Sequence, residues 1–177
     1  MKRILIINLA GIGDFLLSTP SLRALRNKYN EAEIYLLITP RIYKIAKNLN
    51  YINKIVAFNL NYGGKMSFLS TLRNFLILIK LRKKHFDLAI NMRTINTDES
   101  ARKMKLFFEV INPKLKAGRD TEGRGDFFDI KIPETTIGKK YEMEYDIDTV
   151  KALGVDVIDR SIDFIIDSAS EKKLKKS

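Results

Sequence analysis

The chain has 177 residues, of which 45% are apolar and 30% charged, so its composition is that of a soluble globular protein able to bury its own core. It contains no Cys and a single His, His85, which excludes disulfide frameworks, iron–sulfur ligation and Cys nucleophiles and disfavours a His-rich metal site. The net charge is +11, and the basic excess lies in residues 1–118, because residues 119–177 are net acidic. Such a charge favours anionic partners, although a merely solubilising surface is an equal alternative.

The N-terminal sequence is not typical of an exported protein. Met1, Lys2 and Arg3 precede an apolar run that breaks at Asn8 without a cleavage site for a signal peptidase. No apolar run reaches the ~20 residues that a membrane-spanning helix needs. We therefore expect a cytoplasmic protein.

Short apolar runs typical of buried parallel strands alternate with helical patterns along the chain. The expected strands are 4–7, 34–38, 55–58, 86–92 and 115–118. The first expected helix runs from the small-residue loop 10–13 to Lys28, with Pro20 early in the helix. Further helices are expected over 42–49, 66–84, 99–110 and 141–153, and the last of them ends at Gly154. Residues 119–125 are expected to form a polar loop, and the residues after Ser168 a polar linker or tail. The alternation predicts an α/β fold with a Rossmann-like, doubly wound, mainly parallel sheet.

Ligands of such sheets bind at the carboxyl ends of the strands, which directs attention to the loops 8–14, 39–41, 59–65 and 91–98. The first loop contains Gly11-Ile12-Gly13-Asp14. It has two glycines of a dinucleotide-binding motif, but Leu16 replaces the third glycine and Asp14 would repel a pyrophosphate. No Walker A motif occurs. An NAD, FAD or other bound cofactor is therefore not expected.

Asp14 has two interpretations from its position alone. An isolated Asp at the start of a helix is typical of an N-cap, which stabilises the helix by about 1 kcal/mol. At the mouth of an α/β cleft, the same carboxylate would instead serve as a general base for a hydroxyl nucleophile. Gly11 and Gly13 likewise either permit a tight strand-to-helix turn or leave space for a ligand.

A longer match favours the second interpretation. The segment 3–26 combines the apolar strand Arg3-Ile4-Leu5-Ile6-Ile7 with Gly11-Ile12-Gly13-Asp14-Phe15-Leu16-Leu17-Ser18-Thr19-Pro20 and a Leu/Arg helix that reaches Arg26. It resembles the start of the ADP-heptose:lipopolysaccharide heptosyltransferases, glycosyltransferase family 9. Phe86–Asn91 resembles a later strand of that family, and Ala152-Leu153-Gly154 resembles its helix end before the interdomain region.

The resemblance implies the N-terminal domain of a GT-B fold, in which two Rossmann-like domains face each other across a cleft. Residues 1–168 would be the acceptor-binding domain and residues 169–177 the start of the interdomain linker, while the C-terminal donor-binding domain is absent from this chain. The implied reaction is an inverting transfer of a sugar from ADP-heptose to a lipopolysaccharide core or related envelope glycan, with no metal and no cofactor. The chain alone would then be inactive.

The resemblance also implies roles for individual residues. Asp14 matches the general base of the family, and Gly11 and Gly13 would let the acceptor approach the backbone. Because the acceptors are lipid-linked saccharides that carry carboxylates and phosphates, the basic residues on predicted loops are candidate acceptor contacts. In order of preference they are Arg124 and Lys65, then Arg93 and Arg119. A solvated surface charge is an alternative for each.

The predicted helix 66–84 carries apolar residues at helical spacing, followed by a basic end. The apolar positions are Phe68, Leu69, Leu72, Phe75, Leu76 and Ile79, and the basic ones are Lys80, Arg82, Lys83 and Lys84. This pattern fits a core helix with a basic C-terminus. It also fits an interfacial helix of a peripheral protein seated on the inner leaflet of the membrane.

An alternative function is a basic α/β binding module, without catalytic activity, for nucleic acid or another anionic ligand. A nucleic-acid partner is not expected, because the aromatic residues lie mostly in apolar runs and do not alternate with Lys and Arg as in a base-stacking surface. In a degenerate half-domain, Asp14 would be only a helix cap.

Overall fold

The computed structural model describes residues 1–59 and 68–164. These residues form a six-stranded sheet in the order β3-β2-β1-β4-β5-β6, in which every neighbouring pair is parallel. The strands are β1 (Arg3–Asn8), β2 (Glu33–Ile38), β3 (Lys54–Ala57), β4 (Leu88–Asn91), β5 (Leu115–Thr121) and β6 (Ile130–Glu134). The predicted α/β fold with a parallel sheet is confirmed.

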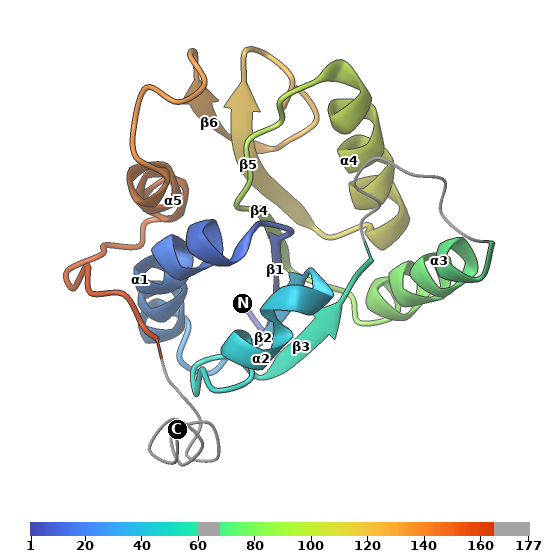
Figure 1. Cartoon of the computed structure of the whole chain (residues 1–177), viewed down its shortest axis with the longest axis horizontal. Coiled ribbons are helices and arrows are strands. Elements are labelled where there is room, and N and C mark those ends of the chain that lie inside the picture. The colour runs from blue at the N-terminus through green and yellow to red at the C-terminus, as the bar shows by residue number, and fades with distance from the viewer. Residues whose placement is uncertain (60–67, 165–177) are drawn as a thin grey trace, which may run out of the picture.

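Helices cover both faces of the sheet (Figure 1). The helical elements are α1 (Ile12–Lys28), the 3-10 turn η1 (Pro40–Ile42), α2 (Tyr43–Ala46), α3 (Phe68–Arg82), α4 (Asp98–Ile111) and α5 (Glu142–Lys151). Side chains alternate along a strand, so Ile4 and Ile6 of β1 pack under α1 and α5, whereas Leu5 and Ile7 pack under α3 and α4. Two apolar cores, one on each face, make the fold doubly wound.

The strand order reverses between β1 and β4. The chain first builds outward from β1 through β2 to β3, and then returns to the other side of β1 to build β4, β5 and β6. The loops after β1 and β4 therefore diverge at the carboxyl edge of two adjacent strands, which is where doubly wound sheets bind their ligands. Asp14 lies in the first turn of α1, directly after the loop that follows β1, and Arg93 lies in the loop after β4.

Pro20 lies in the middle of α1, so the prediction that it lies near the start of the helix is wrong. A proline there removes the N–H that would bond to the carbonyl of Leu16. The hydroxyl of Thr19 donates a hydrogen bond to that carbonyl at 2.7 Å, and so satisfies the acceptor that Pro20 leaves unpaired. This local replacement lets the helix continue to Lys28.

Strands β5 and β6 differ from the predictions. Arg119 and Thr121, predicted in a polar loop, belong to β5, and Arg119 is paired with Ile132 of β6. β6 itself was not predicted, because Pro133 interrupts an otherwise alternating pattern. A proline is tolerated there because β6 is the edge strand of the sheet.

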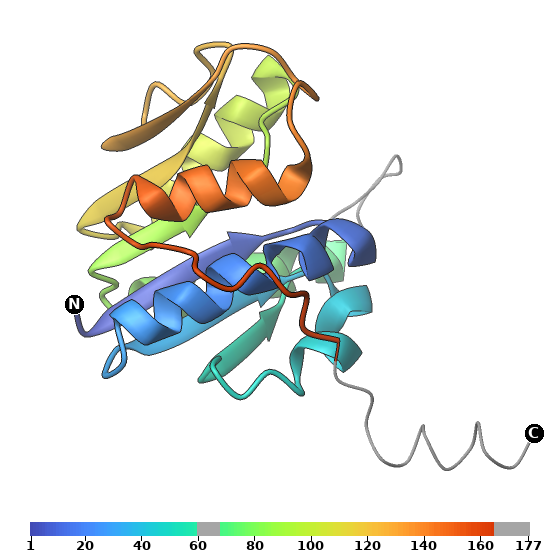
Figure 2. The same cartoon turned by 90° about the vertical axis from the view of Figure 1, so that its left-hand side faces the viewer.

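The chain after α5 turns back along α1 (Figure 2). Gly154, with φ +72°, ends the helix as predicted. Arg23 of α1 then binds Asp159 at 2.9 Å and Asp163 at 2.5 Å. The N–H of Asp163 donates to Thr19 at 2.9 Å, so this returning segment is fastened to α1 at several points.

Some predictions fall outside the described residues. They are Lys65, most of the loop 59–65, the domain boundary at Ser168 and the linker 169–177. The structure does not test them.

Candidate functional site

Asp14 is the third residue of α1, in the first turn of the helix. The N-cap is Gly11, and no side chain caps the helix, so the N-cap interpretation of Asp14 is wrong. Its carboxylate instead lies 3.2 Å from the guanidinium Nη1 of Arg93 and remains 43% exposed. A carboxylate in the first turn is also favoured by the helix dipole. Asp14 is therefore held in place and still accessible to a ligand.

Arg93 comes from the loop after β4 and bridges two carboxylates. Its Nη1 lies 3.2 Å from Asp14 and 3.0 Å from Oε1 of Glu142, at the start of α5. The side chain of Asn91 fixes the backbone of this loop, because its amide donates to the Arg93 carbonyl at 2.7 Å and its oxygen accepts from the Arg93 N–H at 3.3 Å. The predicted residues Asp14 and Arg93 are thus brought together, and Arg93 is not a solvated charge.

Arg119 continues the series of ion pairs into the interior. Its Nη1 is 2.9 Å from Glu142, and its Nη2 is 2.5 Å from Asp146 of α5. The guanidinium also lies 4.9 Å from the centre of the Tyr145 ring, a cation–π distance. Arg119 is fully buried, so the prediction of an acceptor-binding cation on a flexible loop is wrong for this residue.

The five charged residues form one alternating series, which we call the ion-pair chain: Asp14, Arg93, Glu142, Arg119 and Asp146. Three carboxylates face two guanidinium groups, and the exposed fraction falls from Asp14 through Arg93 and Glu142 to the buried pair of Arg119 and Asp146. Burial raises the pKa of Asp146 to about 8, with Arg119 opposing the shift and Glu142 adding to it. The buried end therefore anchors α5, while the exposed end presents Asp14.

The two glycines beside Asp14 are not required by the fold. Gly11 has an ordinary φ of −76°, and Gly13 is in the helix. A Cβ placed on either residue would meet no other group within 4 Å. The tight-turn interpretation of these glycines is therefore wrong, and they leave an open, side-chain-free surface next to the carboxylate.

Arg124 lies outside the ion-pair chain. Its Nε is 2.9 Å from Asp98 of α4, and its Nη1 is 2.6 Å from Glu122. Both pairs are at the carboxyl edge, since Arg124 follows β5 and Asp98 begins α4. The structure gives Arg124 two carboxylate partners and does not join it to Asp14.

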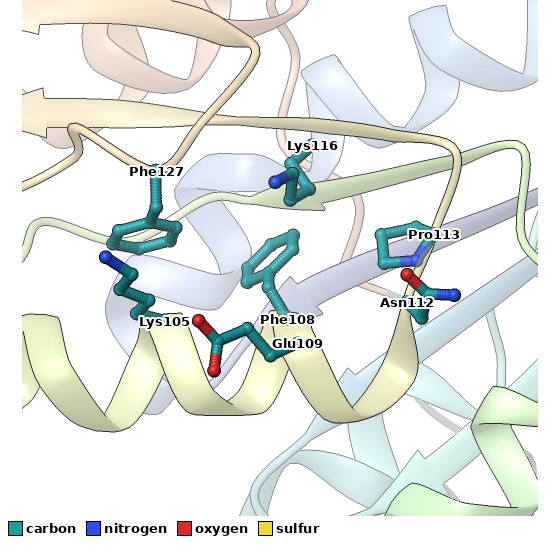
Figure 3. A pocket seen from close by; sticks show the side chains of 7 residues that line it. All are labelled: Lys105, Phe108, Glu109, Asn112, Pro113, Lys116 and Phe127. Carbon is teal, nitrogen blue, oxygen red and sulfur yellow. The ribbon is translucent and has the colours of Figure 1, made fainter.

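A small pocket of about 130 Å³ lies between α4 and β5 (Figure 3). Phe108 and Phe127 line it with ring centroids 6.0 Å apart, and the charged residues Lys105 and Glu109 also line it. None of the residues that line it belongs to the ion-pair chain. The pocket is therefore separate from the Asp14 surface.

Two residues of the ion-pair chain, Glu142 and Asp146, were not predicted from the sequence, and neither was the burial of Arg119. One feature of the sequence did point to a buried ion pair. Asp146 lies beside Ile147 and Val150 on the apolar side of the helix predicted at 141–153, and a carboxylate there needs a buried cation. The identity of that cation was not visible, because Arg119 is distant in sequence and was predicted to lie in a loop.

The solved structures that share this fold include three that the chain matches over about half of their length. No family model matches the sequence, and no curated protein matches it. The glycosyl transferase family 9 structure from Veillonella parvula DSM 2008 superposes with a TM-score of 0.73 at 18% identity and covers 99% of this chain. The E. coli ADP-heptose lps heptosyltransferase II superposes at 0.64 and 15% identity over 99% of the chain. E. coli heptosyltransferase WaaC with ADP superposes at 0.69 and 16% identity over 91%.

The chain spans 48%, 50% and 50% of these three structures, respectively. At such identities the likeness establishes the fold. The chain therefore has the α/β fold of one half of these GT-B glycosyltransferases, as the sequence resemblance predicted.

Proposed function

We propose that this chain is the acceptor-binding half of an inverting glycosyltransferase, with Asp14 as its general base. The observation that carries the proposal is the position of Asp14. It is an accessible carboxylate at the carboxyl edge of the sheet, held by Arg93 at 3.2 Å and preceded by two glycines, Gly11 and Gly13, that the fold does not need. The fold shared with glycosyltransferase family 9 structures supports this assignment.

The proposed reaction is a single displacement at the anomeric carbon of the donor sugar. An acceptor hydroxyl loses its proton to the Asp14 carboxylate as its oxygen forms a bond to the anomeric carbon of the donor sugar. The bond from that carbon to the donor phosphate breaks on the opposite face, and the nucleoside diphosphate leaves with the electron pair. Attack from the opposite face inverts the anomeric centre.

Arg93 fixes the direction of the Asp14 carboxylate, and Glu142 in turn fixes Arg93 at 3.0 Å. A base that is already oriented loses little entropy when the acceptor binds. Gly11 and Gly13 allow the acceptor hydroxyl to approach Asp14 closely. The exposed part of the Arg93 side chain, 27% of its surface, offers a cation to an anionic acceptor.

The proposed donor is a nucleotide sugar of the ADP-heptose kind, bound by a second α/β domain. One of the three similar structures is described with ADP and another as an ADP-heptose lps heptosyltransferase, which supports this class of donor. The proposed acceptor is a lipopolysaccharide core or a related envelope glycan with carboxylate or phosphate groups. The excess of Lys and Arg in residues 1–118 suits such an acceptor.

Acceptor binding can be tested on this chain directly. An anionic core oligosaccharide is titrated into the isotopically labelled chain, and amide chemical shifts are followed by NMR. We expect the largest changes at Gly11–Asp14 and at Arg93, and weaker binding in an Arg93→Met variant. Shift changes confined to other surfaces, or an absence of binding at millimolar saccharide, would contradict the proposal.

A further inference from the structure

Helix α3 exposes a stripe of large apolar side chains. Phe68 and Leu69 are 80% and 75% exposed, and Leu72, Phe75 and Leu76 are between 44% and 52% exposed. These positions recur at helical spacing and lie on one side of the helix. A contiguous exposed apolar surface of this kind marks a site of interaction.

The opposite side of α3 is firmly attached to the body of the domain. Leu81 is buried in the core beneath α3 and α4. Asn74 is also buried, and its amide donates to the Asn59 carbonyl at 2.7 Å while its oxygen accepts from the Asn59 N–H at 3.3 Å. The orientation of α3 is therefore fixed, and its apolar stripe points away from the sheet.

Cations flank the stripe on the same helix and just after it. Arg73, Lys80, Lys83 and Lys84 are exposed, and none forms a salt bridge with a residue in the described ranges. The sequence around them is unusual, because residues 34–86 contain ten Lys and Arg residues and no Asp or Glu. Within the part of the chain that the structure describes, the stripe is thus bordered by cations that have no carboxylate partner.

We infer that α3 docks on the surface of an anionic lipid bilayer. An apolar stripe bordered by cations is the pattern of a helix that lies in the membrane interface, with its apolar side chains among the acyl chains and its cations among the headgroups. Nucleic acid would satisfy the cations but would leave the apolar stripe in water. Among the described residues, no helix is long and apolar enough to span a bilayer.

The position of α3 relates the inferred surface to the candidate site. The chain leaves β3 at the carboxyl edge of the sheet, and α3 carries it back to the amino end of β4. The most exposed residues, Phe68 and Leu69, therefore lie toward the same edge as Asp14. This inference does not depend on the proposed glycosyltransferase activity, because it stands on the exposure and charge of α3 alone.

Vesicle flotation tests the inference with the complete chain. The probes are vesicles of phosphatidylcholine alone and of phosphatidylcholine mixed with phosphatidylglycerol. We expect the chain to float only with the mixed vesicles, and to dissociate from them as salt rises. A Leu72→Glu, Phe75→Glu double variant should lose binding at least tenfold, whereas Leu106→Glu, at a position 60% exposed on α4, should bind like wild type.

Charge is tested by a triple variant with Lys80, Lys83 and Lys84 changed to Gln. At about 1 kcal/mol per cation near an anionic surface, its partition coefficient should fall roughly a hundredfold. Circular dichroism confirms that each variant is folded. The inference is wrong if the wild type does not float with anionic vesicles, or if the double variant floats as well as Leu106→Glu. It is also wrong if the wild type does not bind vesicles, elutes as a dimer in gel filtration, and becomes a monomer in the double variant. A second copy of the chain would then cover the stripe.

Discussion

Replacement of Gly13 by Ala should raise stability and lower acceptor affinity. Gly13 is in the first turn of α1, and an added Cβ would meet no group within 4 Å, so the methyl group causes no clash. Ala is favoured over Gly in a helix by about 1 kcal/mol, and by less near its end. We therefore expect a gain of roughly 0.5–1 kcal/mol in the free energy of unfolding, or about 1–4 °C in Tm for a domain of this size.

The same methyl group should impede the ligand. It would stand on the open surface beside Asp14, where the proposed acceptor approaches the backbone. Overpacking of a close contact costs about 1–3 kcal/mol, which corresponds to roughly a 5–150-fold rise in Kd. Stability is measured by urea unfolding, and acceptor affinity by isothermal titration calorimetry with the core oligosaccharide.

Gly154→Ala is the matched control. Gly154 has φ +72°, so Ala there is strained and should destabilise the fold by about 1 kcal/mol without changing acceptor affinity. Loss of stability in Gly13→Ala would show that the fold needs this glycine. A stabilised Gly13→Ala protein with unchanged Kd would show that no ligand approaches at this position. Either result would contradict the prediction for Gly13.

Three further predictions concern buried or hydrogen-bonded charges. Hydrogen bonds from Lys114 and from two backbone N–H groups hold the pKa of Asp87 well below its usual range, so Asp87→Asn should cost about 2 kcal/mol at pH 7. In urea unfolding, this difference in stability should shrink progressively as the pH falls from about 4 toward the lowered pKa of Asp87. Arg119→Met leaves the buried Asp146 without its hydrogen-bond partner and should cost about 1–3 kcal/mol, most of which the Arg119→Met, Asp146→Leu double variant should restore; a double variant as unstable as the single one would contradict this. Because burial raises the pKa of Asp146, the folded state holds more protons than the unfolded state between about pH 4 and 8, so wild type should lose stability relative to Asp146→Asn as the pH rises through this window. If the difference in stability between wild type and Asp146→Asn did not change with pH, Asp146 would not be the group that holds the extra proton of the folded state.

The fold was predictable because its signals are local. The apolar runs around Ile4–Ile7 and Ile34–Ile38 are long enough to identify buried strands, and the helical patterns between them imply parallel connections. Pro20 and Pro133 were the points of error. Each breaks a local rule, and each is tolerated through tertiary context: the Thr19 hydroxyl in one case and an edge position in the other.

The site was predictable only in part. Asp14 and Arg93 could be expected near each other, because their loops leave adjacent strands at the point where the strand order reverses. Their direct ion pair could not be predicted, because Arg93 also binds Glu142. That residue lies on α5, almost fifty residues further along the chain. The burial of Arg119 depends on how α5 packs against β5, and no local pattern in the sequence encodes that contact.

The role of Asp14 as general base is tested by comparing wild type with Asp14→Asn in sugar transfer, with a donor-binding half fused to this chain or added to it. Asn is nearly isosteric and leaves Arg93 paired with Glu142, so the fold and acceptor binding should be retained. A general base contributes about 10²–10⁴-fold, so we predict a fall in kcat of that size with little change in acceptor Kd. Transfer at the wild-type rate by Asp14→Asn would contradict the assignment of Asp14 as the base.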